Sequence, residues 1–459
     1  MDLRRLDANV RALRQRIAGT ACSVPHHSND NPAPAKKAPG RKRPSSPSQR
    51  KAANTDGRID PPSCFLCGVV KKNGYGLGAA AIASRLMELG CEMLAVYCAD
   101  EALPFADEAF HHQTPVLLLM PELEADGAGP LRRLAAAGLL HFTIHDPDQL
   151  RPLDALGHKI GRPVPAHLFL DTGMSRLGMN EDQLRRSLAA LGGTRFIAPV
   201  GICSHLACAD DDPLFTDRQR REFERLSAIA QPVLGPTFRR HLANTFATLR
   251  DRTLHMDMVR CGLGLLGYGL EATGRVSPPP VSAAELSPVS PVLRWVSRLI
   301  HVQRYGSGCS VGYGATWTLQ RESVLGVVPV GYGDGYPLGL SNGAAVRIFS
   351  NFREFDRVPV DASPCSAGMS ASLEGLAGGG SQRLVAVCPV LGRVNMDQIV
   401  IDLTDVPLPR EELWRCEVEL IGHDATAPNA LPTLAAAAGL HSYALLCQLG
   451  SHLPRRYLR

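Results

Sequence analysis

The arrangement of apolar and polar positions divides the chain into three stretches. In the first, apolar residues recur at the spacing of one helix face: Leu3, Leu6, Val10, Leu13 and Ile17. This spacing predicts an amphipathic helix over 3–18. Between about 65 and 262, short apolar runs alternate with helical segments. Period-two stretches then continue to about 418, which is typical of a mainly β domain.

The middle stretch contains eight apolar runs of strand length. They lie at 65–71, 93–98, 115–120, 140–146, 166–171, 197–205, 238–244 and 256–260. Strands that alternate with helices in this order favour a parallel sheet, and eight such units close most naturally into a (β/α)₈ barrel. The predicted fold is therefore α/β, with an N-terminal (β/α)₈ barrel followed by a mainly β C-terminal domain.

Composition changes mark the expected domain limits. Residues 21–62 are rich in Pro, Ser and basic side chains, with seven basic and no acidic residues between Asn31 and Thr55, which predicts a disordered insert. A Pro/Ser-rich linker and a Gly/Ser-rich insertion are expected further along. The predicted divisions are 1–20 helix, 21–62 insert, 63–272 barrel, 273–292 linker and 293–459 β domain, with the insertion at 350–382.

Charge and cysteine content limit the classes of partner. The net charge is +5, but residues 1–60 hold thirteen Lys/Arg against five Asp/Glu, so the remainder is about −3. We therefore expect no nucleic-acid partner for the body of the protein. Thirteen cysteines favour reduced thiols, and the Cys64/Cys67 pair lacks a second pair at zinc-site distance, so no metal site is predicted. Without an apolar span or signal peptide, we expect a cytoplasmic protein and no membrane association.

A lysine stands at the end of the first run of the predicted barrel. The run before it has the length and β-branched content of a buried parallel strand, and Lys71 follows. Gly74, Gly76 and Gly78 then precede a predicted helix over 79–89. A strand, a lysine and a glycine-rich turn can hold a phosphate at the helix N-terminus beside an amine.

The segment Lys71-Lys72-Asn73-Gly74-Tyr75-Gly76-Leu77-Gly78 resembles the pyridoxal-phosphate lysine motif of the alanine racemases. The family usually has Ala where Lys72 and Gly74 stand. The resemblance implies that Lys71 forms a Schiff base with pyridoxal 5′-phosphate and that Tyr75 binds its phosphate. Lys71 has the family's spacing to Tyr75, and the alternation of side chains along a strand agrees with choosing it over Lys72.

Other segments of the predicted barrel also resemble family motifs. Asp171-Thr-Gly-Met-Ser-Arg176-Leu-Gly178 implies that Arg176 lies beside the cofactor phenolic oxygen and the substrate carboxylate, which a guanidinium binds well. Many members have a lysine where this chain has Phe169. The resemblance implies further cofactor contacts: His205 against the ring, Thr245, Gly262 and Leu263 at the phosphate, and Arg260 at the pyridine nitrogen. Because arginine cannot accept a proton, the ring nitrogen stays unprotonated and transamination is disfavoured.

The predicted β domain carries the remaining motifs. Val311-Gly312-Tyr313-Gly314-Ala315-Thr316 resembles the family's catalytic-tyrosine motif, and Tyr332 follows nineteen residues later, as in the family. Gly392-Arg393-Val394-Asn395-Met396-Asp397-Gln398 resembles the segment whose methionine N–H meets the substrate carboxylate. The resemblance thus implies substrate contacts at Tyr332, Met396 and Asp397, and a phosphate contact at Tyr443.

Together the motifs imply an alanine racemase that interconverts L- and D-alanine and supplies D-alanine for peptidoglycan. A racemase removes and delivers the α-proton on opposite faces, so two bases are needed. The resemblance gives Lys71 the D-alanine side and Tyr313 the L-alanine side, with Tyr313 and Met396 donated by the partner in a homodimer with shared sites. Two alternatives stay open. Asn395, where the family often has Cys or Ser, allows a racemase of broader specificity, and Phe169 allows a non-catalytic pyridoxal-phosphate-binding paralogue.

Overall fold

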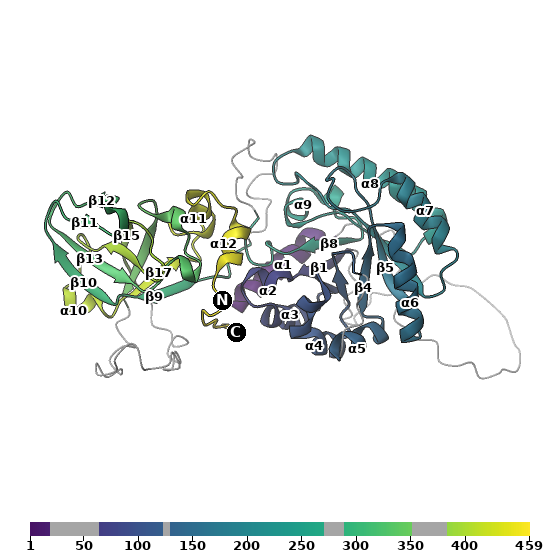
Figure 1. Cartoon of the computed structure of the whole chain (residues 1–459), viewed down its shortest axis with the longest axis horizontal. Helices are drawn as coiled ribbons and strands as arrows, with labels where there is room; N and C mark the ends of the chain where they lie inside the picture. Colours follow the sequence, from purple (N-terminus) through teal and green to yellow (C-terminus); the bar gives the residue numbers. More distant parts are fainter. Residues whose placement is uncertain (19–63, 123–128, 270–288, 351–382) are drawn as a thin grey trace, which may run out of the picture.

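The computed structural model describes residues 1–18, 64–122, 129–269, 289–350 and 383–459. Figure 1 shows a barrel surrounded by helices on one side and a separate β domain on the other. The predicted insert at 21–62 lies outside the described residues, as do most of the predicted linker and of the 350–382 insertion. None of the described helices is long and apolar enough to cross a membrane.

Eight parallel strands form the barrel, and each overlaps one of the eight predicted runs. They are β1 (Phe65–Val69), β2 (Met93–Val96), β3 (Val116–Leu118), β4 (Leu140–Ile144), β5 (Val164–Phe169), β6 (Ile197–Cys203), β7 (Arg239–His241) and β8 (Met258–Cys261). The sheet order runs from β7 down to β1 and then to β8. Backbone hydrogen bonds from Arg260 to Ala243 (2.9 Å) and from Asp257 to Arg240 (3.0 Å) bring β8 against β7 and nearly close the ring.

Helices cover the outside of the barrel. They are α1 (Leu3–Ile17), α3 (Ala79–Glu88), α4 (Ala106–His111), α5 (Pro130–Ala137), α6 (Leu150–Ile160), α7 (Glu181–Leu191), α8 (Pro213–Leu234) and α9 (Thr245–Arg250). The short element α2 (Lys71–Tyr75) is a turn beyond the carboxyl end of β1. The predicted N-terminal helix is confirmed as α1, and all five of its predicted apolar positions are buried. Strands β2, β4, β5 and β8 are buried along their whole length, as expected of a parallel sheet with both faces covered.

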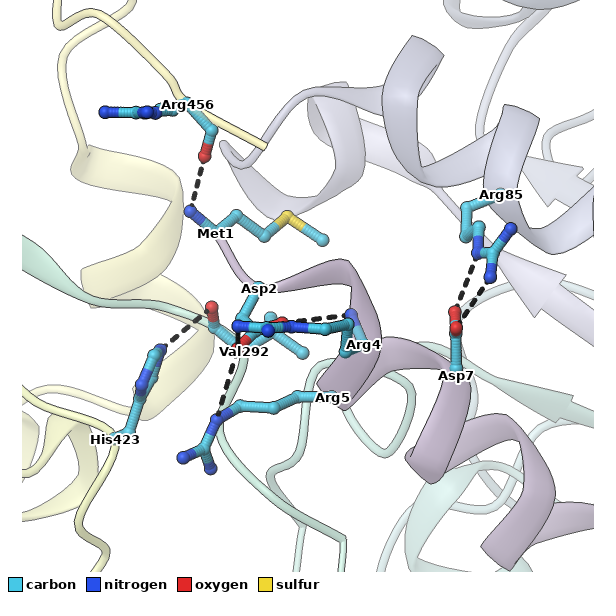
Figure 2. Close-up of polar contacts among 9 residues, drawn as sticks. All are labelled: Met1, Asp2, Arg4, Arg5, Asp7, Arg85, Val292, His423 and Arg456. Atoms are coloured by element: carbon cyan, nitrogen blue, oxygen red, sulfur yellow. Dashed lines mark hydrogen bonds and ion pairs between the residues drawn. The ribbon is translucent and has the colours of Figure 1, made fainter. Parts of the chain in front are cut away.

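The chain ends meet the start of the β domain beside α1 (Figure 2). The Asp2 N–H donates to Val292 O (2.9 Å), and the amine of Met1 donates to Arg456 O (2.6 Å). Asp2 also forms a parallel bridge with Leu458. On the other side of the helix, Asp7 pairs with Arg85 of α3 at 2.6 Å. These contacts fix α1 and the C-terminal segment to the same edge of the barrel.

The second domain is mainly β, as predicted. Its seven-stranded sheet has the order β10-β13-β16-β15-β14-β17-β9 and its paired strands are antiparallel. The strands are β9 (Trp295–Arg298), β10 (His301–Tyr305), β13 (Ser323–Val328), β14 (Ala345–Ser350), β15 (Arg383–Leu391), β16 (Ile399–Asp402) and β17 (Glu417–Ile421). A hairpin of β11 (Ser310–Val311) and β12 (Trp317–Thr318) and the helices α10 (Arg410–Leu413), α11 (Leu431–Ala437) and α12 (Ser442–Gln448) complete it.

Candidate active site

Lys71 begins α2, immediately beyond β1 at the carboxyl end of the barrel. The strand was predicted to continue through Lys71, but it ends at Val69 because the chain turns there. Residues 72–75 all have left-handed φ angles between 52° and 62°. Such a conformation costs a non-glycine residue about 1–2 kcal/mol, and strain of this kind is concentrated at functional sites. The argument from strand alternation therefore does not apply to the two lysines.

Different surroundings distinguish the two lysines instead. Lys72 Nζ lies 3.0 Å from Glu101 Oε1, and its backbone N–H donates to the same carboxylate at 3.2 Å. Lys71 is more buried, and burial lowers the pKa of its amine, with a further lowering by the nearby charge of Arg176. A lysine with a lowered pKa offers more of the neutral, nucleophilic amine at a given pH.

The C-terminal segment holds the lysine turn in place. Arg455 Nε donates to Gly76 O at 2.8 Å, and the Tyr457 hydroxyl donates to Leu77 O at 2.9 Å. A Cβ on Gly76 would lie 2.4 Å from a backbone oxygen of α12, and one on Gly78 would lie 1.9 Å from the Tyr457 hydroxyl. These two glycines are therefore required by the approach of the C-terminal segment, as well as by their positive φ angles.

At the N-terminus of α3, where the sequence suggested a phosphate could bind, protein groups already occupy the first donor. The Ala79 N–H there already donates to Asn73 Oδ1 at 2.9 Å, and Tyr457 covers Gly78. Side-chain and backbone donors are available instead after β8.

The five residues predicted to bind the phosphate do come together. The N–H groups of Gly262 and Gly264 donate to Thr245 Oγ1, both at 3.2 Å. A Cβ on Gly262 would lie only 2.1 Å from the Tyr75 hydroxyl, so this phenol rests directly against the glycine. Leu263 lies between the two glycines, and the Tyr443 ring is 5.6 Å from the Tyr75 ring. Burial raises the pKa of Tyr75, which keeps its hydroxyl a donor.

Arg260 is anchored below this cluster by both terminal nitrogens. Its Nη1 donates to His241 Nδ1 at 2.8 Å and to His241 O at 2.9 Å. Its Nη2 donates to Ser204 O at 2.6 Å and lies 3.4 Å from His205 Nδ1. Among the described residues, none accepts a hydrogen bond from Nε, which leaves this donor for a bound group. Burial and the charge of Arg260 lower the pKa of His205 to about 3, so its ring is neutral.

Arg176 lies close enough to Lys71 and His205 for its charge to lower the pKa values of both. Its loop is ordered by Asp171, whose carboxylate accepts three backbone N–H bonds of 2.9–3.1 Å from residues 173–175. Phe169 at the end of β5 is buried and stacks on His145, with 4.6 Å between ring centroids. The Asp171 turn, and not residue 169, therefore positions the loop that carries the guanidinium.

The predicted site residues of the β domain also gather. The Tyr332 N–H donates to Asn395 O, and the Gly333 N–H donates to Met396 O, both at 2.9 Å. Tyr313 is 71% exposed, Met396 55% and Tyr332 46%, and Asp397 is exposed as well. Tyr313 joins β11 to β12, and Figure 1 shows this hairpin at the end of the β domain far from the barrel. Within one chain the structure does not bring Tyr313 to Lys71.

Three residues that support the lysine turn were not identified from the sequence: Glu101, Arg455 and Tyr457. No local pattern marks them, because each acts through a backbone or side-chain contact with a segment distant in sequence. For Tyr457 the hydrogen-bonded residue is 380 positions away. The described residues contain no group of three or more His, Cys, Asp or Glu side chains placed to bind a metal.

Comparison with known sequences gives a consistent match over both domains. The family model of the alanine racemase N-terminal domain matches residues 49–269, and that of the C-terminal domain matches 292–361 and 370–457. The alanine racemase of Rhodospirillum rubrum is 32% identical over 400 residues, which cover 86% of this chain and 90% of the relative. That of Lactobacillus delbrueckii subsp. bulgaricus is 31% identical over 404 residues, covering 87% and 92%.

Solved structures agree. The alanine racemase from Streptomyces coelicolor has a TM-score of 0.70 at 27% identity, with coverage of 100% of this chain and 96% of the other. The fold also matches an alanine racemase from Bartonella henselae with covalently bound pyridoxal phosphate, with a TM-score of 0.68 at 22% identity and coverage of 100% and 98%. The lysine turn, the donors after β8 and the β domain lie where the motifs predicted them, and the sequence match extends over both domains. The chain belongs to the alanine racemase family.

Proposed function

We propose that this protein is a racemase that interconverts L- and D-alanine with pyridoxal 5′-phosphate attached to Lys71. The observation that carries the proposal is the half-buried Lys71 beyond the carboxyl end of β1, whose amine pKa is lowered by burial and by the nearby charge of Arg176. Support comes from the relatives, which are named alanine racemases, and from the Bartonella henselae structure with its covalently bound cofactor. When bound, pyridoxal phosphate withdraws electrons from the amino acid and makes the α-proton easier to remove.

The residues after β8 fit the phosphate of this cofactor. Gly262 and Leu263 would donate backbone N–H groups, and Tyr75, Thr245 and Tyr443 would donate hydroxyls. The close approach of the Tyr75 hydroxyl to Gly262 supports this assignment, because a side chain at residue 262 would fill the space between the donors. Neutral and backbone donors suit an anion beside a site that already contains the guanidinium groups of Arg176 and Arg260.

Arg260 fits the pyridine nitrogen. Its two terminal nitrogens are held by Ser204, His205 and His241, so Nε–H is the donor that can reach the ring. Since a guanidinium is always a donor, a ring nitrogen in contact with it must accept and remains unprotonated. His205 would pack beside the ring. This arrangement limits electron withdrawal by the ring and favours return of the proton to the α-carbon over side reactions.

Two bases on opposite faces of the substrate complete the proposal. Lys71 would exchange the proton on the D-alanine side and Tyr313 on the L-alanine side. The exposure of Tyr313, and the position of the β11–β12 hairpin at the end of the β domain away from the barrel (Figure 1), support a homodimer in which each chain completes the site of the other. Arg176 would bind the substrate carboxylate, with Tyr332, Met396 and Asp397 contributed by the β domain.

The test compares Lys71→Ala with Lys72→Ala as the matched control. Borohydride should fix pyridoxal phosphate to the wild-type chain and to Lys72→Ala, and mass spectrometry of the digest should place the adduct on Lys71. Racemisation of alanine should disappear in Lys71→Ala and persist in Lys72→Ala. An adduct on Lys72, or full activity without Lys71, would refute the assignment.

Substrate scope is tested with the same protein by exchange of the α-proton in deuterated water. We expect exchange of alanine to exceed that of serine. Comparable exchange of both would favour the broader racemase, and a cofactor adduct without exchange of any amino acid would favour the non-catalytic paralogue.

A further inference from the structure

A chain of three buried histidines runs from Arg260 into the core of the barrel. His241 Nε2 lies 2.9 Å from His167 Nδ1, and His167 Nε2 lies 3.0 Å from His141 Nδ1. All three rings are buried, with exposed fractions of 0%, 0% and 8% in that order. None of the three was predicted to be a site residue. His141 lies on β4 and His167 on β5, and neither has a role in the proposed site.

The hydrogen bonds of this chain can run in only one direction. Arg260 is always a donor, so His241 Nδ1 must accept its hydrogen. Burial lowers the pKa values of all three imidazoles, which are therefore neutral and carry one N–H each. His241 must then hold its proton on Nε2 and donate to His167, and His167 must likewise donate from Nε2 to His141. The orientation of Arg260 thus determines the tautomer of each histidine.

Strand register places the three rings at successive depths in the barrel. His241 is level with Cys203 and hence with Phe169, two residues beyond His167 on β5. His167 is in turn level with Thr143, two residues beyond His141 on β4. The chain therefore descends from the carboxyl end of the barrel towards its amino end. Gly201 makes room for it, because a Cβ there would lie 2.2 Å from His167 Nδ1.

We propose that His167 and His141 are positioning residues for Arg260. By accepting from His241, His167 fixes the one tautomer in which His241 can accept from the guanidinium. Successive N–H donors in a low-dielectric core strengthen one another, so the chain makes His241 Nδ1 a better acceptor. This holds Arg260 with Nη1 and Nη2 occupied and Nε–H turned to the ligand. The inference rests on the proposed function only in identifying that ligand as the cofactor ring.

The tautomers are tested on the apo protein, with neither cofactor nor activity required. In protein labelled with ¹⁵N-histidine, long-range ¹H–¹⁵N spectra should show the proton on Nε2 of His141, His167 and His241, assigned by single substitutions. Couplings across the two N–H···N hydrogen bonds should be visible as well. A proton on Nδ1 of His241 or His167, or a protonated ring in the chain, would overturn the inference, even if the enzyme proves to be an active racemase.

The positioning role is tested by affinity for pyridoxal phosphate, titrated into apo variants. His167→Leu leaves His241 Nε2 without an acceptor and should weaken binding by about tenfold, the loss expected for one buried unsatisfied donor. His167→Gln, whose amide can both accept and donate, should recover part of the loss. His255→Leu is the control, because His255 is also buried and hydrogen-bonded, but to Thr248 O and not to any of the three histidines. If His167→Leu and His255→Leu lost equal affinity for pyridoxal phosphate, the three histidines would have only a structural role.

Discussion

Mild acid should unfold the barrel before the β domain, because the barrel core contains histidines that can be protonated only on unfolding. His141, His145, His167 and His241 are all less than 9% exposed. Burial is the main cause that lowers their pKa values, to about 3 for His141, to about 4 for His145, and well below the usual value for the other two. Each is therefore neutral in the folded barrel between pH 5 and pH 8.

The size of the effect follows from proton linkage. An unfolded histidine has a pKa near ~6.5, so below this pH the unfolded chain binds more protons than the folded one and stability falls as the pH falls. For each histidine, the free energy of unfolding falls by about 1.4 kcal/mol per pH unit below ~6.5, or by roughly 2 kcal/mol at pH 5. Four such groups give about 8 kcal/mol, which is comparable to the whole stability of a typical domain, about 5–15 kcal/mol. The loss is complete only below the folded pKa values.

Two optical signals separate the domains in this experiment. The three tryptophans, Trp295, Trp317 and Trp414, all lie in the β domain, whereas most of the helix surrounds the barrel. On acidification of the apo protein from pH 8 to pH 5, the far-ultraviolet circular dichroism of the helices should decline before tryptophan fluorescence changes. His145→Leu should flatten the pH dependence by one proton, since it removes one of the four histidines whose pKa is lowered by burial, and the exposed His111→Ala serves as the control. A helical signal unchanged at pH 5 would refute the reasoning.

Three further substitutions test the site. Tyr457→Phe removes one hydrogen bond to the lysine turn and should weaken cofactor retention several-fold in dialysis, with Arg459→Ala as the unaffected control. Tyr313→Phe should slow racemisation by about 10²–10⁴, the range for removing an acid–base group, without loss of cofactor. If the two bases come from different subunits, mixing Tyr313→Phe chains with Lys71→Ala chains should restore activity. Heterodimers that form by subunit exchange but stay inactive would contradict this. Gly201→Ala should destabilise the barrel in urea unfolding by more than the same change at Gly193, where φ is not left-handed and an added Cβ makes only an ordinary contact of 3.5 Å.

Much of the barrel could be predicted because its signal is local. Every apolar run except the one at β7 gives a strand buried along most of its length, and the alternation of runs with helical segments needs no knowledge of distant contacts. Strand ends were less accurate. At Lys71 the left-handed turn depends on contacts made by residues far along the chain, so the preference of the apolar run for extended structure was overridden beyond Val69.

The motifs could give the residues of the site but not the contacts that orient them. His241 lies within the predicted run 238–244, yet its connection to His167 and His141 depends on the register of β4 to β7 and on the missing side chain of Gly201. A lone histidine in an apolar strand gives no sign of a partner on another strand. The contacts of Arg455 could not be predicted from the sequence either, because a guanidinium that binds backbone oxygens requires no particular residue type in its partners.

The two halves of the site differ in a way that has a physical reason. On the barrel, Tyr75, Thr245 and Arg260 are buried, and Thr245 and Arg260 are hydrogen-bonded before any ligand binds, so little ordering is left for the cofactor to impose. On the β domain, Tyr313 and Met396 expose large apolar surfaces to water, which in a folded protein is a common mark of an interaction surface. Burying them against a second barrel would remove that surface from water and add a proton-transfer group to a preformed cofactor site. Cofactor binding should therefore depend on one chain and racemisation on two.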